Sequence, residues 1–261
     1  MISLFLLCSL LVVSSALEEC GIKNFGSSGL FAIGRDGTDV QAPWLAAVGA
    51  LRNSSEGYEK FIVTCSGTIL TRRMILTAAH CFGRGVPIYP EYVRAGVTRI
   101  DQKRSQDRKI QEVRIHPDHN NKDWYFDLAL LFLEEKLIFT GRISPLCLPE
   151  KPFKHPGVGR TVSVQGWGEN SNGDIGREVS EATVTVRSPQ ECDYRFSSAG
   201  PSVIDSVRAF LPRLTDSTLI CADSSLDSQA GACHGDSGGP AFIRSVPTSN
   251  PRIIQDPKTT L

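Results

Sequence analysis

Short apolar segments alternate with turn-forming residues along most of this 261-residue chain. Their lengths and their richness in Val, Ile, Leu, Phe and Thr are typical of β-strands bounded by turns. The chain shows neither an internal repeat nor a coiled-coil heptad. The pattern therefore predicts antiparallel β structure, either a barrel or a sandwich. The clearest predicted strands are Phe61–Leu70, Met74–Thr77, Ile110–Ile115, Leu128–Leu133, Thr161–Val164 and Ala182–Val186.

Three segments interrupt this strand pattern. Residues 151–157 are rich in proline, lysine and glycine and predict a crossover between two β units. A short helix is predicted after Ser188, because Ser188 can cap it, Pro189 suits its first position and Glu191 completes a capping box. Residues 245–261 have no strand-like period and are expected to be loosely ordered.

The N-terminus has the pattern of an export signal. An apolar run, Leu4–Val13, is followed by small residues at Ser14 and Ala16, so residues 1–16 are predicted to be a signal peptide. The length of the apolar run disfavours the alternative of a membrane anchor, because a span needs about 20 apolar residues. Asn53 begins a glycosylation sequon, which agrees with a secreted, extracellular protein.

Charge and cysteine content narrow the possible functions. Lys plus Arg and Asp plus Glu both number 28, so nothing favours binding to nucleic acid or to an anionic membrane. No Cys-x2-Cys pair or helical His pair is present, so no metal or other cofactor is expected. Of the 8 cysteines, Cys8 lies in the predicted signal peptide, which leaves an odd number for disulfides in an exported chain.

Three further segments supply the groups that serine-based hydrolysis needs, namely a base, an orienting carboxylate and a nucleophile. His80 follows one apolar segment, Asp127 precedes another, and Ser237 lies among glycines in Gly235–Pro240. The spacing Gly235-x-Ser237-x-Gly239 also fits α/β-hydrolases, in which the catalytic histidine follows the serine. Every histidine in this chain precedes Ser237, which excludes that alternative.

In the order His, Asp, Ser, these segments resemble the trypsin-like, chymotrypsin-fold serine proteases, and other landmarks of that family follow in family order up to about Arg244. The resemblance implies an all-β fold of two six-stranded antiparallel β-barrels with the active site between them. It places the protease domain at residues 36–261, with barrels at about 36–150 and 158–244 and an atypical tail at 245–261. The landmarks are Pro43-Trp44, Cys65-Ser66-Gly67-Thr68, His116-Pro117, Cys147-Leu148-Pro149, Gly166-Trp167-Gly168 and Leu219-Ile220-Cys221-Ala222.

The same resemblance implies a role for each residue of the constellation. His80 is expected to act as general base and acid, Asp127 to orient it, and Ser237 to be the nucleophile. The backbone N–H groups of Gly235 and Ser237 are expected to form the oxyanion hole, and Asp236 to be the counter-ion of an activated N-terminus. Cys233 is left without a family partner in this chain. The implied disulfides are Cys65–Cys81, Cys192–Cys221 and Cys20–Cys147.

The chain departs from the family pattern at its end, at its activation segment and in its specificity pocket. The family continues through further strands after the nucleophile loop, so the second barrel is expected to be incomplete and to lack one pocket wall. Residues 17–35 resemble a pro-segment, but Leu30 stands where a basic residue usually precedes the activation cut. Gly231 stands where members that prefer Arg or Lys carry Asp, so that preference is not supported.

Together these features predict a secreted serine endopeptidase that acts on protein substrates. Protease inhibitors and an activating protease are further expected partners. The alternative is a non-catalytic homologue that binds or regulates, or an inactive truncated product. Residues 197–217 are expected to form a surface insertion.

Overall fold

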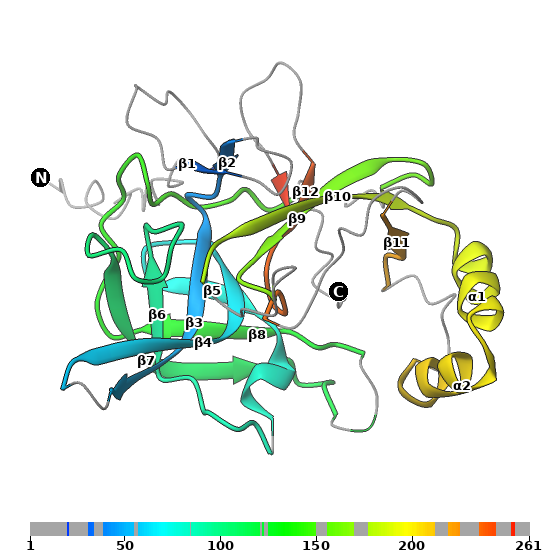
Figure 1. Cartoon of the computed structure of the whole chain (residues 1–261), viewed down its shortest axis with the longest axis horizontal. Helices are drawn as coiled ribbons and strands as arrows, with labels where there is room; N and C mark the ends of the chain where they lie inside the picture. The colour runs from blue at the N-terminus through cyan, green and yellow to red at the C-terminus, as the bar shows by residue number, and fades with distance from the viewer. Residues whose placement is uncertain are drawn as a thin grey trace, which may run out of the picture.

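The computed structural model describes residues 20, 31–33, 39–54, 57–83, 85–120, 122, 125–149, 156–169, 177–211, 219–224, 235–243 and 252–253. Over these residues the chain is mainly antiparallel β structure, with a pair of helices at one end of the molecule (Figure 1). Near the N-terminus, β1 (Phe31–Ile33) and β2 (Asp39–Gln41) pair as a small separate sheet. The all-β prediction is therefore confirmed.

The first half of the chain forms a closed barrel. Its strands follow one another around the barrel in the order β3, β4, β5, β8, β7, β6, and every neighbouring pair is antiparallel. Side chains alternate between the barrel core and its outside, so Ile75, Val93 and Leu131 are fully buried. The strands are β3 (Leu45–Asn53), β4 (Glu59–Ile69), β5 (Met74–Thr77), β6 (Tyr92–Ala95), β7 (Gln106–Ile115) and β8 (Ala129–Leu133).

Strand β3 was not among the strands predicted from the hydrophobic pattern. Its first six residues are buried without alternation, because one face lines the barrel and the other packs against the second half of the chain. A strand buried on both faces shows no period of two, so the pattern alone did not predict it. At its bulge, a Cβ on Gly49 would lie 1.9 Å from the carbonyl oxygen of Ile62, so only glycine fits there.

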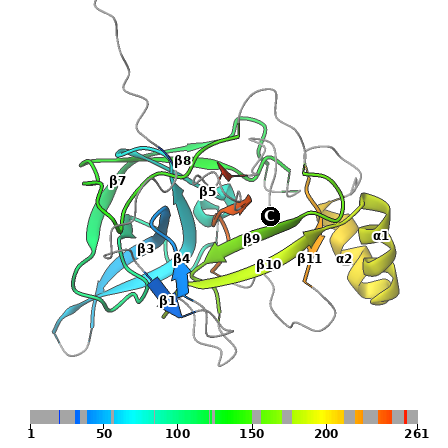
Figure 2. The ribbon, with the colours of Figure 1, turned by 90° about the horizontal axis from the view of Figure 1, so that it is seen from above.

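The second half of the chain forms a five-stranded sheet in the order β11, β10, β9, β12, β13. Figure 2 shows the β9–β10 hairpin lying beside the barrel. The second barrel, which was expected to be incomplete, is an open sheet over the described residues. Its strands are β9 (Thr161–Gly166), β10 (Ser180–Val186), β11 (Ala222–Asp223), β12 (Ala241–Ile243) and β13 (Arg252–Ile253).

Strand β13 corrects one expectation about residues 245–261. Its two residues pair with β12, with Phe242 opposite Ile253 and Ile243 opposite Arg252. The free edge of β12 presents main-chain N–H and C=O groups that need partners, and a short extended segment supplies them. The expectation that this segment holds no strand was wrong at these two positions.

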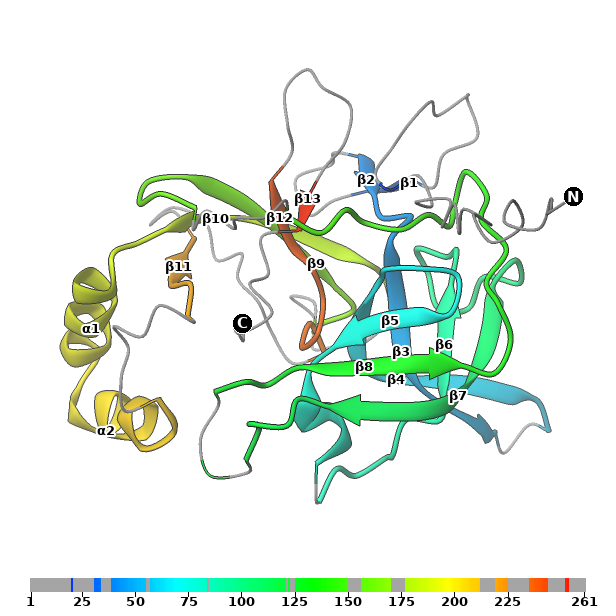
Figure 3. The same cartoon turned by 180° about the vertical axis from the view of Figure 1, so that it is seen from behind.

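The predicted helix is confirmed as α1 (Pro189–Ser198). Its N-cap Ser188 accepts a hydrogen bond from the N–H of Glu191 at 3.1 Å, which satisfies one free donor of the first turn. A second helix, α2 (Pro201–Phe210), occupies the expected insertion at 197–217 and was not predicted. Figure 3 shows both helices at the end of the molecule opposite the closed barrel. An ion pair between Arg208 and Asp193, 2.9 Å apart, links the two helices.

The two halves meet around Trp44, which is fully buried just before β3. Its indole ring meets the ring of Phe242 edge to face, with centroids 5.2 Å apart. Its Nε1–H donates to Oε1 of Gln165, on β9, at 2.9 Å. An apolar and a polar contact therefore join the barrel to the second sheet at one side chain.

Several predicted features lie outside the described residues. They include the signal peptide at 1–16, most of the crossover at 151–157, and the residues Gly231 and Cys233. No helix within the described part of the chain is long and apolar enough to cross a membrane.

Candidate active site

His80 lies in η1 (Ala79–Phe82), a short 3-10 turn that follows strand β5. Its main-chain N–H donates to Oδ1 of Asp127 at 2.7 Å, and its ring Nδ1 lies 2.5 Å from Oδ2 of the same carboxylate. One carboxylate thus holds both the backbone and the imidazole of His80. With Nδ1 bonded to Asp127, Nε2 is the ring nitrogen left to exchange a proton with another group.

The two partners differ in their access to solvent. The side chain of Asp127 is 3% exposed, whereas that of His80 is 48% exposed. A buried carboxylate with a hydrogen bond on each oxygen keeps its position, because moving it would leave a buried charge unpaired. The imidazole, in contrast, is open to solvent.

The backbone before Asp127 is held in an unusual conformation. Phe126 has a φ of 54°, the positive value that L-residues rarely adopt. Its ring stacks on the imidazole of His116, with centroids 5.1 Å apart and planes 14° apart. The N–H of His116 also donates to the carbonyl of Leu128 at 2.9 Å. These contacts on both sides of Asp127 restrain its backbone, and no local pattern in the sequence indicates that Phe126 and His116 make them.

The loop Gly235–Pro240 is anchored to the barrel by Ser66 of strand β4. The N–H of Ser66 donates to the carbonyl of Ser237 at 2.8 Å. The Ser66 hydroxyl donates to the carbonyl of Gly235, also at 2.8 Å. The loop that holds the predicted nucleophile is thus bonded on both sides of Asp236 to a strand of the other half of the molecule.

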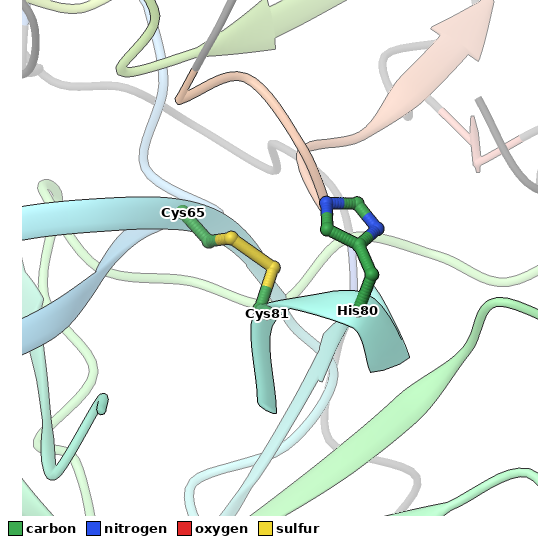
Figure 4. A group of neighbouring side chains, drawn as sticks. All are labelled: Cys65, His80 and Cys81. Carbon is green, nitrogen blue, oxygen red and sulfur yellow. A yellow bond between two sulfur atoms is a disulfide. The ribbon is translucent and has the colours of Figure 1, made fainter. Parts of the chain in front are cut away.

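Gly238 brings this loop against the residues that precede His80. It has a φ of 81°, and a Cβ there would lie 2.2 Å from Oγ1 of Thr77 and 2.7 Å from the N of Ala78. Only glycine permits both this conformation and this approach. Figure 4 shows the imidazole of His80 extending from η1 toward the orange segment that leads into β12. The three predicted triad segments therefore meet at one edge of the barrel.

The carboxylate of Asp236 lies at the end of strand β9. Its Oδ1 accepts a hydrogen bond from the N–H of Gly168 at 2.6 Å. A Cβ on Gly166 or Gly168 would lie 2.2 Å or 2.3 Å from a carboxylate oxygen of Asp236. The two glycines therefore leave the space that this carboxylate occupies, with the fully buried Trp167 between them.

A disulfide between Cys65 and Cys81 ties strand β4 to the turn that holds His80 (Figure 4). It closes a loop with a sequence separation of 16, which stabilises the fold by about 3 kcal/mol. The two sulfurs and a ring nitrogen of His80 lie within 4.8 Å of one another, a grouping that could hold a metal ion. Because the sulfurs are bonded to each other they are not thiolates, so these three residues do not form a metal site.

The other predicted features lie elsewhere in the fold. Cys192–Cys221 and Cys20–Cys147 are both formed, so all three predicted disulfides are confirmed. Asn53 is exposed at the end of β3.

Comparisons with known proteins agree with this geometry. The sequence model of the trypsin family matches residues 33–248. Phenoloxidase-activating factor 1 of Holotrichia diomphalia is 32% identical over 79% of this chain and 56% of its own length. Serine proteinase stubble of Drosophila melanogaster is 28% identical over 89% of this chain and 28% of its own length. Limulus clotting factor C of Carcinoscorpius rotundicauda is 26% identical over 87% of this chain and 22% of its own length.

A solved structure supports the same fold. Neuropsin, a serine protease expressed in the limbic system of mouse brain, superposes with a TM-score of 0.57 and 24% identity, over 82% of this chain and 85% of neuropsin. The chain spans 56% or less of the length of the three relatives named above. The family match covers most of the chain, including the segments of His80, Asp127 and Ser237. The chain therefore belongs to the trypsin family.

Proposed function

We propose that this chain is a secreted serine endopeptidase that hydrolyses peptide bonds through Ser237. The observation that supports this most strongly is the His80–Asp127 pair, with both carboxylate oxygens bonded to His80 and the Ser237 loop packed against the same turn. A Ser-His-Asp acyl-transfer site needs a buried carboxylate, an accessible imidazole and a nucleophilic serine. Asp127, His80 and Ser237 supply these three groups.

The proposed reaction proceeds through an acyl-enzyme. Ser237 Oγ attacks the carbonyl carbon of the scissile bond while its proton passes to Nε2 of His80, and Asp127 stabilises the resulting imidazolium. The carbonyl oxygen takes up negative charge and accepts hydrogen bonds from the N–H groups of Gly235 and Ser237. Nε2 then protonates the leaving amine as the C–N bond breaks. Water then attacks the ester carbonyl as its proton passes to Nε2 of His80. The C–O bond to Ser237 breaks, Oγ recovers the proton from Nε2, and the carboxylic acid product leaves.

Asp236 is proposed to bind the ammonium group of a new N-terminus after proteolytic activation. Its carboxylate is held beside Gly168, next to the Gly235–Ser237 segment that would form the oxyanion hole. An ammonium group at this position would add a charge-assisted hydrogen bond to the one from Gly168 and so fix the loop. An activating protease and protease inhibitors are the partners that this proposal implies.

The proposed substrates are proteins. The relatives are named as an activating factor, a proteinase and a clotting factor, which suits limited cleavage of other proteins. Gly231 in place of an acidic residue gives no basis for a preference for Arg or Lys at the cleavage site.

A fluorophosphonate probe tests the proposed nucleophile directly. We expect the purified chain to be labelled, since the probe reacts with an activated serine hydroxyl, and we expect Ser237→Ala to abolish labelling. Ser66→Ala is unsuitable as a control because Ser66 touches the loop, so Ser202→Ala, on the exposed start of α2, serves as the matched serine variant. If the chain stays unlabelled before and after trial proteolysis, the non-catalytic alternative holds instead.

Export and glycosylation are proposed together. Residues 1–16 would direct export, and Asn53 is exposed where an N-linked glycan could attach. Expression in a eukaryotic secretory host should give medium-borne protein whose mass falls on treatment with an N-glycosidase. Asn53→Gln and Ser55→Ala should both lose this mass shift, because each breaks the sequon. Asn120→Gln, which removes an asparagine outside any sequon, should retain it, and a shift that survives Asn53→Gln would contradict the assignment.

A further inference from the structure

Ser66 is a polar residue at the centre of the molecule, with none of its surface exposed. It lies within strand β4, where its neighbours pair with β3 and β5. Its N–H and its hydroxyl both reach the nucleophile loop, and its carbonyl accepts a hydrogen bond from Oγ1 of Thr77 at 2.7 Å. The buried serine is thus bonded through its backbone and its side chain.

The hydroxyl of Ser66 forms two hydrogen bonds, one to the residue that follows strand β9 and one to the nucleophile loop. It accepts from the N–H of Trp167 at 2.9 Å and donates to the carbonyl of Gly235 at 2.8 Å. The N–H of Trp167 can only donate, so it occupies a lone pair of the hydroxyl oxygen. The hydroxyl proton is thereby directed to Gly235, and both functions of the group are used.

Gly235 needs such a restraint more than other residues would. Its φ is 95°, and a glycine has no Cβ to limit rotation about its backbone. Anchoring its carbonyl fixes the plane of the peptide that joins it to Asp236, and so limits how far Gly235 can rotate. The next N–H after Trp167, that of Gly168, holds the Asp236 carboxylate itself.

These bonds form one continuous connection. It runs from strand β4, through the Ser66 hydroxyl, to the end of β9 on one side and to the nucleophile loop on the other. Separately, the Ser66 N–H holds the carbonyl of Ser237. The residues on both sides of Asp236 are therefore held by a single residue of the barrel.

We infer that Ser66 is a positioning residue for the oxyanion hole, and that its hydroxyl keeps Gly235 oriented and couples it to Gly166–Gly168. This inference rests on the proposed function, because it takes the N–H groups of Gly235 and Ser237 as the oxyanion donors. It predicts a defect in stabilising the transition state, with substrate binding largely preserved.

Ser66→Ala removes the hydroxyl and retains the Cβ and the backbone bonds. We expect kcat to fall about tenfold with KM little changed, compared with the roughly 10²–10³-fold loss found when an oxyanion donor is itself removed. Affinity for a peptide aldehyde, whose tetrahedral adduct places an oxyanion in the hole, should fall by the same factor as kcat/KM. A merely structural role for Ser66 would not link these two quantities.

Thr68 provides the matched control on the same strand. It is also fully buried, and its hydroxyl has no hydrogen-bond partner among the described residues. Thr68→Val therefore removes a buried hydroxyl without removing a bond, and we expect unchanged kcat and aldehyde affinity. Ser66→Cys, which retains a weaker donor in a larger side chain, should lie between wild type and Ser66→Ala and serves if the alanine variant does not fold.

Amide hydrogen exchange gives a readout that does not require activity. In Ser66→Ala, peptides that span 165–168 and 235–240 should exchange faster than in wild type and in Thr68→Val. A wild type that fails to react with the fluorophosphonate probe would refute the proposed function, while faster exchange would still establish the Ser66 connection. Unchanged exchange, or unchanged kcat and aldehyde affinity in an active enzyme, would overturn the inference.

Discussion

Replacing Asp127 by asparagine is expected to lower kcat by about 10⁴-fold while the protein stays folded. The carboxylate accepts from the main-chain N–H and from Nδ1 of His80 at once. In the variant, the amide oxygen can satisfy the main-chain N–H, which leaves the amide NH2 facing Nδ1. Because two donors cannot pair, the imidazole must then present Nδ1 as an acceptor and hold its proton on Nε2. Nε2 can no longer accept the proton of Ser237.

The measurement is steady-state hydrolysis of a peptide ester or amide, with the far-ultraviolet circular dichroism spectrum as a check of folding. Asp118→Asn is the matched control, because Asp118 also lies near a histidine, with its Oδ2 4.0 Å from Nδ1 of His116, but is exposed. It should retain full activity. An Asp127→Asn enzyme within tenfold of wild type would show that Asp127 does not orient the catalytic base.

The sequence predicted best those strands and helices whose positions depend on residues close together in the chain. Strand β5 matched its predicted range, because Met74–Thr77 alternates between the core and the outside. The N-cap of α1 was predicted from Ser188 and Glu191, whose contact depends on residues three apart in the chain. Helix α2 was missed, since its N-cap Gly200 makes no side-chain cap bond that a capping pattern could indicate.

The site depends on register, which local patterns do not contain. His80 and Asp127 are 47 residues apart and meet because β5 and β8 pair with Thr77 opposite Ala129. From the sequence alone, only the ordered family landmarks indicated that the two would meet. No local pattern indicates the role of Ser66, because its partners are distant in the chain. The hydroxyl of Ser66 bonds to Gly235, 169 residues away, and to Trp167, 101 residues away.

The largest loss of stability is expected from Trp44→Ala. The indole is fully buried between the two halves, so its removal should lower the free energy of unfolding by about 3 to 5 kcal/mol. That is a large part of the roughly 5 to 15 kcal/mol that holds a typical domain folded. The edge-to-face contact with Phe242 and the hydrogen bond to Gln165 disappear together.

A second variant separates the two contacts of this ring. Trp44→Phe keeps most of the apolar contact with Phe242 but removes the N–H that donates to Gln165, and should cost about 1 to 3 kcal/mol. Guanidinium unfolding measures both variants, in a Ser237→Ala background so that self-cleavage cannot contribute. Tyr194→Ala, at a ring that is 72% exposed, should change stability by no more than about 0.5 kcal/mol. If Trp44→Ala were as mild as Tyr194→Ala, the two halves would not depend on Trp44. If instead the free energy of unfolding rises from Trp44→Ala to Trp44→Phe to wild type, one side chain contributes both an apolar contact and a hydrogen bond to the junction of the two halves. The Ser237 loop lies at this junction.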